Sequence, residues 1–344
     1  MSLLKIFLVS ITAFLLIGCG EAEKPKDVVN VTVTVTNPVD KTTKVLTPNF
    51  NADSAYNFIQ NQLDFGFRIP NTPEHDSCAA WIKRKLTEYG FTLTIQTGKV
   101  KAWTGNMLNI ENIIAQYNPE ATNRIMLCTH WDTRPYADRG TGNKTKPIPG
   151  ANDGGSGVGV LLEIARQISL SDPKTGVDLI FFDAEDYGAM STNDVISDLN
   201  TMGDSWCLGS QYWSKNPPIK NYKPRYGILL DMVGAKDATF PKEGLSQKYA
   251  GTHVQRIWKE AEVLGYGKYF VKKIAPAITD DHTYINQIAG IPTLDIVHYA
   301  PKGSYGSFDF GHFHHTQKDN MDIIHKETLK AVGQTVIHIV YQKI

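Results

Sequence analysis

The chain has 344 residues, of which 42% are hydrophobic, enough to form the core of one large domain or two small ones. Lysine plus arginine and aspartate plus glutamate both number 35, so the formal net charge is zero. Nucleic-acid binding usually requires a concentrated positive field, and the balanced charge does not supply one. We therefore expect no nucleic-acid partner.

The first 18 residues have the pattern of an export signal. An apolar run from Ile6 to Ile17 follows Lys5, and it is too short for a membrane-spanning helix, which needs about 20 residues. The run ends in Leu16-Ile17-Gly18-Cys19, which resembles the bacterial lipobox, where the cysteine is lipidated after cleavage. An ordinary signal peptide or a weak membrane anchor are the alternatives. The pattern predicts an exported protein held on a bacterial membrane by lipid on Cys19, facing the periplasm.

Residues 19–48 are rich in lysine, threonine, valine and asparagine, and we interpret them as a flexible tether. Residues 49–344 then form the catalytic domain. The cysteines other than Cys19 have spacings that match neither a zinc knuckle nor a disulfide framework. Cys78 falls on the apolar side of a predicted helix and Cys128 lies inside a predicted strand, so we expect buried thiols and no thiol catalysis.

Helix and strand patterns alternate through this domain. Apolar residues at helical spacing predict helices over 53–63, 74–89, 156–168, 247–264 and 326–341, with a short helix after Thr279. Apolar runs rich in β-formers predict strands over 92–100, 108–117, 124–129, 177–182, 226–230 and 291–297. This order predicts a single doubly wound α/β domain with a mostly parallel central sheet flanked by helices. The polar segment 187–205 is expected to form a lid or a pocket wall.

Two adjacent carboxylates, Glu185 and Asp186, stand just past the carboxyl end of the predicted strand 177–182. Open α/β sheets bind their ligands at this edge. Neighbouring carboxylates repel each other unless a cation or a shared proton compensates. One of the two can therefore bind a metal while the other stays free as a base.

Metal-capable side chains recur at other strand ends and in Gly-rich or His-rich loops, namely His130, Asp153, Asp231 and His315. Each of them alone is more often structural, because an isolated aspartate at a strand end usually caps a helix or bonds within a loop. Together they favour a metal site. The mixture of histidine and carboxylate suits zinc and lacks the closely spaced, all-oxygen pattern of a calcium loop.

Five segments, taken in order, resemble the co-catalytic zinc aminopeptidase family. They are His130-Trp131-Asp132, Ala151 to Gly157, Phe182 to Asp186, Leu230 to Gly234, and His315-Thr316. The resemblance extends from about Phe50 to the end of the chain. Within the family, three further segments resemble the branch of glutaminyl-peptide cyclotransferases. These are Thr279-Asp280-Asp281-His282, the segment from Trp206 to Trp213, and Phe313-His314-His315-Thr316 followed by Asp319-Asn320.

The resemblance implies roles for individual residues. The cyclase pattern makes Asp153, Asp186 and His315 the ligands of one zinc ion, and Glu185 the acid and base. The remaining implied positions are the catalytic acids Asp231 and Asp280 around that glutamate, His130 as a second-metal ligand or structural residue, and Trp131, Trp206 and His314 as pocket residues. For each tryptophan, the alternative is a core position, which is commoner for a buried indole.

Two positions depart from the family pattern. Asp186 stands where most relatives have glutamate, so a carboxylate shorter by one methylene group must reach the metal. His314 stands where animal cyclases have tryptophan. The aspartate at position 186 affects a second metal site. The histidine at position 314 affects the shape of the substrate pocket.

The resemblance implies a zinc-dependent glutaminyl-peptide cyclotransferase, an acyltransferase that converts the N-terminal glutamine of peptides or secreted proteins to pyroglutamate and releases ammonia. One zinc ion per chain is expected. The alternative is a zinc aminopeptidase with two zinc ions, in which Glu185 would activate a bound water. A degenerate member retained as a binding domain is disfavoured because Asp153, Glu185 and His315 are all intact.

Overall fold

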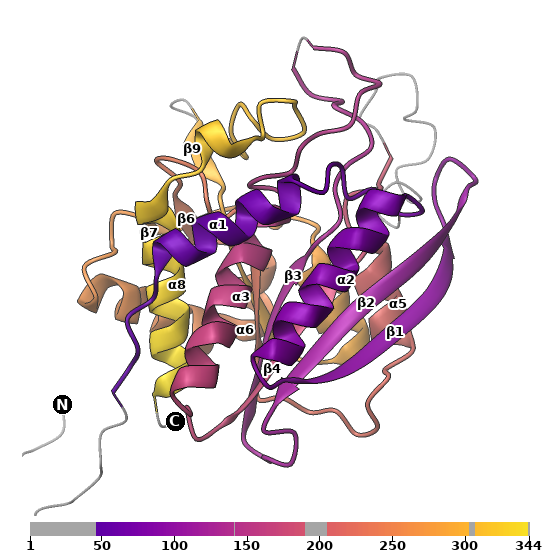
Figure 1. Cartoon of the computed structure of the whole chain (residues 1–344). Helices are drawn as coiled ribbons and strands as arrows, with labels where there is room; N and C mark the ends of the chain where they lie inside the picture. Colours follow the sequence, from indigo (N-terminus) through magenta and orange to yellow (C-terminus); the bar gives the residue numbers. More distant parts are fainter. Residues whose placement is uncertain (1–45, 141, 190–204, 303–306, 343–344) are drawn as a thin grey trace, which may run out of the picture. The chain divides into compact units, whose positions relative to one another are not determined.

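Figure 1 shows the computed structural model of the chain. The structure describes residues 46–140, 142–189, 205–302 and 307–342. The expected export signal, Cys19 and nearly all of the tether lie outside the described residues, as does most of the expected lid segment. No helix within the described ranges combines the length and the apolar character that crossing a membrane requires.

A six-stranded sheet forms the centre of the described residues, in the order β1-β2-β4-β3-β5-β8. Its strands are β1 (Thr92–Lys101), β2 (Met107–Tyr117), β3 (Arg124–His130), β4 (Gly176–Phe182), β5 (Gly227–Asp231) and β8 (Thr293–Val297). β4, β3, β5 and β8 pair in parallel, whereas β2 is antiparallel to both β1 and β4. The prediction of a mostly parallel sheet is confirmed.

Helices cover both faces of this sheet, as the doubly wound prediction requires. One face carries α1 (Ala52–Leu63), α2 (Pro73–Glu88), α3 (Gly155–Leu170) and α8 (Lys326–Tyr341), which lie in front of the sheet in Figure 1. The other face carries α5 (Leu208–Lys215) and the π-helix η2 (Ile285–Ala289), which follows α7 (Asp281–Tyr284). α6 (Gly244–Val263) packs beside the edge strand β8 and against α8.

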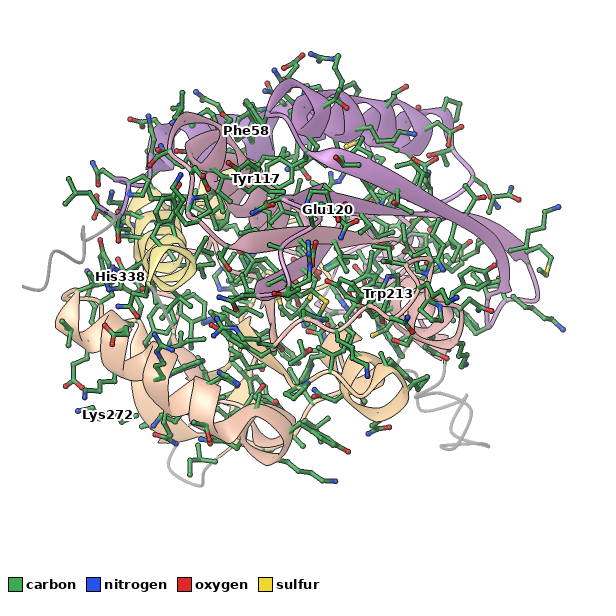
Figure 2. The ribbon with its side chains drawn as sticks, turned by 90° about the horizontal axis from the view of Figure 1, so that it is seen from below. Phe58, Tyr117, Glu120, Trp213, Lys272 and His338 are labelled. Atoms are coloured by element: carbon green, nitrogen blue, oxygen red, sulfur yellow. The ribbon has the colours of Figure 1, made fainter. Side chains whose placement is uncertain are left out.

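Side chains alternate between the two faces along each buried strand. In β4, Leu179 and Phe181 join the core beneath α1 and α3, whereas Phe182 joins the core beneath α5. Figure 2 shows Phe58 of α1 and Trp213 of α5 on opposite sides of the sheet. Because the parallel strands are covered on both faces, apolar residues predominate on both of their sides, which is why their sequences read as largely hydrophobic runs.

The predicted helices and strands are confirmed to within a few residues at their ends. The prediction missed α5 and two small sheets. These sheets are β6 (Phe240–Lys242) with β7 (Phe270–Ile274), and β9 (Ala300–Lys302) with β10 (Ser307–Asp309). Segments of three to five residues are too short to show a period.

The expected behaviour of the cysteines is also confirmed for the described residues, where Cys78, Cys128 and Cys207 are free and buried. Burial raises the pKa of the Cys78 thiol to about 12. It also raises the pKa values of Cys128 and Cys207 well above the ordinary thiol value. Nucleophilic cysteine chemistry needs an accessible thiolate, and these side chains do not provide one.

A buried ion pair joins β3 and β4 at the amino-terminal end of the sheet. The Asp178 carboxylate accepts two hydrogen bonds of 2.7 Å from the Arg124 guanidinium and one of 2.8 Å from the Tyr222 hydroxyl. Asp178 has a side-chain exposure of 0% and Arg124 of 8%. The ion pair therefore stabilises the pairing of β3 with β4. It lies away from the opposite edge of the sheet, where the parallel strands end.

We predict that Asp178→Ala lowers the free energy of unfolding by about 3–5 kcal/mol, because it leaves a buried guanidinium without its counter-charge. Urea denaturation measures the change. Glu262→Ala is the control, since it removes the exposed ion pair with Lys272 and should cost no more than about 1 kcal/mol. Equal losses in the two variants would contradict the prediction.

Candidate active site

The carboxyl ends of three neighbouring parallel strands bring the predicted site residues together. His130 and Asp231 are the last residues of β3 and β5, while Glu185 and Asp186 follow β4. Because β4, β3 and β5 are adjacent and parallel, they end at one edge of the sheet. This is the edge where α/β sheets hold their ligands.

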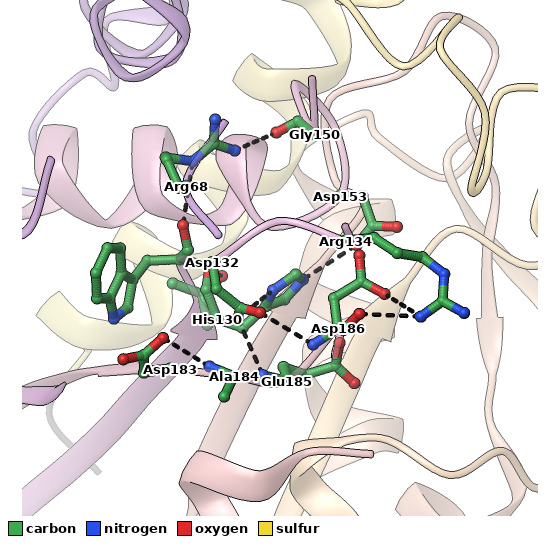
Figure 3. A network of polar contacts seen from close by, with 12 residues as sticks. Arg68, His130, Asp132, Arg134, Gly150, Asp153, Asp183, Ala184, Glu185 and Asp186 are labelled. Atoms are coloured by element: carbon green, nitrogen blue, oxygen red, sulfur yellow. Dashed lines mark hydrogen bonds and ion pairs between the residues drawn. The ribbon is translucent and has the colours of Figure 1, made fainter. Parts of the chain in front are cut away.

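The turn after β4 is strained and tightly held. Ala184 has a φ of +51°, a left-handed conformation that costs a non-glycine residue on the order of 1 kcal/mol or more. The Asp183 carboxylate accepts hydrogen bonds from the backbone N–H groups of Ala184 and Glu111, both at 2.7 Å. The Asp132 carboxylate accepts from the N–H groups of Glu185 at 3.0 Å and Asp186 at 3.2 Å (Figure 3). Asp132 and Asp183 thus hold the backbone of this turn, which sets the direction of the Glu185 and Asp186 side chains.

The loop that carries Asp153 is fixed from two sides. The buried Arg68 guanidinium donates to the carbonyl oxygens of Trp131 at 3.1 Å and Gly150 at 2.6 Å, joining this loop to the end of β3 (Figure 3). Asp319 accepts a hydrogen bond from the Asp153 N–H at 3.0 Å. The sequence pattern indicated neither role, because nothing in the spacing of Arg68 or Asp319 relates them to this loop.

Gly154 is required at its position for two reasons. Its φ is +75°, which favours glycine, and a Cβ atom there would lie 2.8 Å from Cε1 of His130. A larger residue would therefore displace either the histidine or the adjoining Asp153. The glycine that follows Asp153 in the sequence thus allows the close approach of the two site loops.

Asp153, Asp186 and His315, the predicted zinc ligands, lie together. Nε2 of His315 is 3.3 Å from Oδ1 of Asp186 and 3.9 Å from Oδ2 of Asp153. The Oδ2 atoms of both aspartates are buried and accept no hydrogen bond from any described residue. Buried carboxylate oxygens without donors are costly, and a cation between them would satisfy both. The donor set of one imidazole and two carboxylates suits zinc.

The pKa values of Asp153 and Asp186 also indicate that a cation is needed between the two carboxylates. Burial and the nearby charge of Asp153 raise the pKa of Asp186 to about 6. Burial opposes ionisation of Asp153 too, but the hydrogen bond and charge of His130 outweigh it and hold the pKa of Asp153 below its ordinary value. A divalent cation at the trio would offset the repulsion and keep both carboxylates ionised.

His315 is oriented by residues that the sequence prediction missed. Oδ1 of Asp138 lies 3.1 Å from Nδ1 of His315, which leaves Nε2 free to face the two aspartates. Arg134 donates to both carboxylate oxygens of Asp138, at 2.9 and 2.8 Å, and to the backbone carbonyl of Asp186 at 2.9 Å. Carboxylate–histidine pairs of this kind orient metal-ligating imidazoles. Arg134 and Asp138 lie in a polar loop whose sequence carries no signal for this role.

Glu185 is half-buried and stands next to the trio without belonging to it. Desolvation and the neighbouring carboxylates of Asp280 and Asp186 raise the pKa of Glu185 well above its ordinary value, against the opposing charge of His130. Cys207 donates its S–H to Oε1 of Glu185 at 3.1 Å. A carboxyl group with a raised pKa, open to a cavity, can accept and return a proton near neutral pH.

The other two predicted acids lie beside this glutamate. Asp280 forms the N-cap of α7, and Asp231 lies 3.2 Å from His130, measured from Oδ1 to Nε2. Burial raises the pKa of both carboxyl groups. Nε2 of His130 is also 3.1 Å from Oδ1 of Asp153, so His130, Asp153 and Asp231 form a second group that can hold either a proton or a metal ion.

A cavity of about 380 Å³ opens onto these residues. Its lining comprises Arg139, Asp153, Glu185, Trp206, Asp231, Met232, Ile278, Thr279, Asp280, Phe310, His314 and His315. Trp206 and His314 therefore lie where the sequence placed them, and the Trp206 ring stacks on His315 with centroids 5.5 Å apart. His314 is also close enough to Asp153 and His315 to serve as an alternative metal ligand.

The expectation that Trp131 lines the pocket requires correction. Its side chain is fully buried, stacks on His75 at 4.2 Å and donates its indole N–H to the carbonyl oxygen of Glu111. Trp131 follows His130 directly, and alternate residues at a strand end point to opposite sides of the sheet. It therefore belongs to the core beneath the helices, with its polar group satisfied there.

Comparison with known proteins places this arrangement in a family. Residues 112–340 match the peptidase family M28. The chain belongs to this family. The family and the solved zinc-dependent relative described below imply zinc. The trio of Asp153, Asp186 and His315 supplies donor types that suit this ion, and Asp153, His314 and His315 also lie close enough together to hold one.

Solved structures of M28-like proteins resemble the whole described fold. A Zn-dependent exopeptidase from Parabacteroides distasonis is 47% identical, with a TM-score of 0.82, and the match covers 87% of this chain and 100% of that one. A glutaminyl cyclase from Bacteroides thetaiotaomicron, solved with N-acetylhistamine, is 46% identical with the same TM-score and coverage. A glutaminyl cyclase from Tannerella forsythia is 48% identical, with a TM-score of 0.81, over 86% of this chain and 100% of that one.

Curated relatives are more distant. Aminopeptidase YwaD of Bacillus subtilis is 26% identical over 75% of this chain, and bovine glutaminyl-peptide cyclotransferase is 25% identical over 66%. The chain spans 50% of the length of the first protein and 64% of the second. The relatives thus include both peptidases and cyclases.

We predict that Asp138→Ala lowers the affinity for Zn²⁺ about 10-fold to 100-fold, because His315 loses the carboxylate that orients it. Competition with a chromophoric chelator measures the affinity without reference to catalysis. Asp309→Ala, which removes an exposed acid paired with Lys302, should leave the affinity unchanged. An Asp138 variant that is folded, by circular dichroism, and binds Zn²⁺ normally would disprove this role.

Proposed function

We propose that the protein is a zinc-dependent glutaminyl-peptide cyclotransferase that converts N-terminal glutamine of peptides or secreted proteins to pyroglutamate. The observation that carries the proposal is Glu185, a carboxyl group with a raised pKa that faces the cavity beside the metal-capable trio and is not itself needed as a ligand. The glutaminyl cyclases that are 46% and 48% identical support an attacking amine over an attacking water.

The reaction needs a polarised amide and a proton carrier. Asp153, Asp186 and His315 would hold one Zn²⁺, which acts as a Lewis acid on the γ-carboxamide oxygen when bound. The α-amino group of the substrate is protonated near neutral pH, so Glu185 removes a proton from it before the nitrogen attacks the carboxamide carbon. The new C–N bond closes the ring, and the old C–N bond breaks as Glu185 gives its proton to the leaving nitrogen, which departs as ammonia. The ring nitrogen then passes its second proton to the Glu185 carboxylate, and that proton leaves to solvent, so the pyroglutamyl nitrogen keeps one hydrogen.

The buried acids Asp231 and Asp280 assist the proton transfer by Glu185, and their burial is what suits them to this role. Burial raises the pKa of both carboxyl groups, which favours the protonated form of each. A protonated Asp280 would reduce the negative charge beside Glu185. The low-dielectric setting strengthens each of these interactions.

An aminopeptidase is the second candidate, favoured by the group of His130, Asp153 and Asp231, which can hold a second ion. The exopeptidase and aminopeptidase relatives are consistent with it. In that reaction Glu185 would deprotonate a water molecule instead of the substrate amine. We propose one zinc ion per chain, as the cyclase requires, whereas two would favour the peptidase.

We also propose that the protein is exported and lipid-anchored through Cys19, facing the periplasm of a bacterial cell. The apolar run before Cys19 and the lipobox-like Leu16-Ile17-Gly18-Cys19 support this proposal. Its substrates would then be the amino-terminal segments of secreted peptides and proteins. Labelling of cells with a radioactive fatty acid tests the anchor, and a Cys19→Ala chain should not be labelled.

We predict that the protein purified without residues 1–19 releases ammonia from peptides with an N-terminal glutamine. A coupled ammonia assay measures this reaction, and mass spectrometry detects the loss of ammonia from the peptide. A matched peptide with N-terminal leucine is the control. Release of free leucine at a comparable rate would reject the cyclase in favour of the peptidase.

We predict that Glu185→Gln lowers kcat about 100-fold to 10,000-fold while Zn²⁺ stays bound, because the amide keeps the shape of the side chain but cannot carry the proton. Metal analysis of the purified variant supplies the second measurement. Unchanged turnover in a zinc-loaded variant would remove Glu185 from the mechanism.

A further inference from the structure

A second cavity adjoins the catalytic pocket. It has a volume of about 530 Å³ and lies between the β9–β10 hairpin and the loop that contains Arg139 and Gly140. Arg139 and His314 line both cavities, so the two meet at these residues. A substrate bound by its amino terminus in the first cavity has room to continue into the second.

The two cavities differ in charge. The catalytic pocket is lined by four carboxyl groups, those of Asp153, Glu185, Asp231 and Asp280, whose oxygens can accept hydrogen bonds from the amino terminus of a peptide. In the second cavity, Lys302 is paired with Asp309 at 2.8 Å, and these charges cancel. The exposed Arg139 guanidinium forms no ion pair with any described residue. Alongside the hydrogen bond from Lys302, its charge helps to lower the pKa of Asp309, but it has no direct carboxylate partner among the described residues where the cavities meet.

Arg139 is held close to the proposed zinc site. Its backbone N–H donates to the carbonyl oxygen of His315 at 3.2 Å, and its guanidinium carbon lies 5.9 Å from the centre of the Phe310 ring. Consecutive residues of an extended peptide are separated by about 3.3–3.6 Å. With the first residue of the substrate at the zinc ligands, the side chain of the second or third residue is within reach of Arg139.

We propose that Arg139 is a specificity residue that selects substrates with an acidic side chain at the second or third position, after the N-terminal glutamine. The inference rests on the proposed cyclase function and adds the class of peptide that it prefers. The substrate would be bipolar, with its amino group in the acidic pocket and its carboxylate against Arg139. An exposed ion pair of this kind changes kcat/KM by about twofold to fivefold.

The test compares kcat/KM of the full chain for C-terminally amidated peptides Gln-Glu-Tyr-Ala and Gln-Lys-Tyr-Ala, and for Gln-Ala-Glu-Ala and Gln-Ala-Lys-Ala. We expect the glutamate peptide of at least one pair to be favoured about twofold to fivefold, and less so at high salt because the pair is exposed. Arg139→Gln should abolish this preference and Arg139→Glu should reverse it. Arg84→Glu, which makes the same charge change on α2, should leave it intact.

Each outcome of this comparison either supports or contradicts the role of Arg139 in substrate selection. If the wild-type protein and Arg139→Glu show the same ratio between the peptides of each pair, Arg139 does not select the substrate. If the wild-type protein cyclises every glutamine peptide without a charge preference, this inference fails and the proposed function stands. If the wild-type protein cyclises none of them, the proposed function fails and the inference fails with it.

Discussion

The site depends on how the protein keeps several carboxylates ionised and close together in a buried place. Oδ2 atoms of Asp153 and Asp186 have no hydrogen-bond donor among the described residues, and the carboxylates repel each other across the position that His315 faces. A buried carboxylate oxygen without a donor is costly, so these two atoms call for compensation. A zinc ion held by Asp153, Asp186 and His315 would supply positive charge there, and much of the surrounding arrangement serves to place these three side chains.

The proposed zinc ligands are placed by residues outside the trio. Asp132 accepts the backbone N–H groups that follow β4, while Arg134 joins Asp138 to the backbone of Asp186. The backbone is left-handed at Ala184 and also at His315, a conformation that non-glycine residues avoid unless their surroundings hold them in it. Strain of this sort concentrates at functional sites because it directs side chains that relaxed backbone would turn elsewhere.

One carboxylate framework can serve two reactions in this family. A glutamate at the position of Glu185 can deprotonate an amine or a water molecule, and the difference lies in how the substrate and the second group of His130, Asp153 and Asp231 are used. If His130 retains a proton, it balances those two aspartates without a second ion. In this chain the group of His130, Asp153 and Asp231 could therefore hold either a proton or a second ion.

The sequence by itself determined the order of the long helices and of the six strands of the central sheet, because buried parallel strands are largely apolar runs and surface helices repeat their apolar residues with a period near 3.6. It also identified the strand-end acids and histidines that the fold brings together, since parallel strands end at one edge. Only the tertiary structure decided that Trp131 points into the core and that Arg68, Arg134 and Asp138 support the site. Such contacts form between segments far apart in the chain, or within loops without a period, so no local pattern can reveal them.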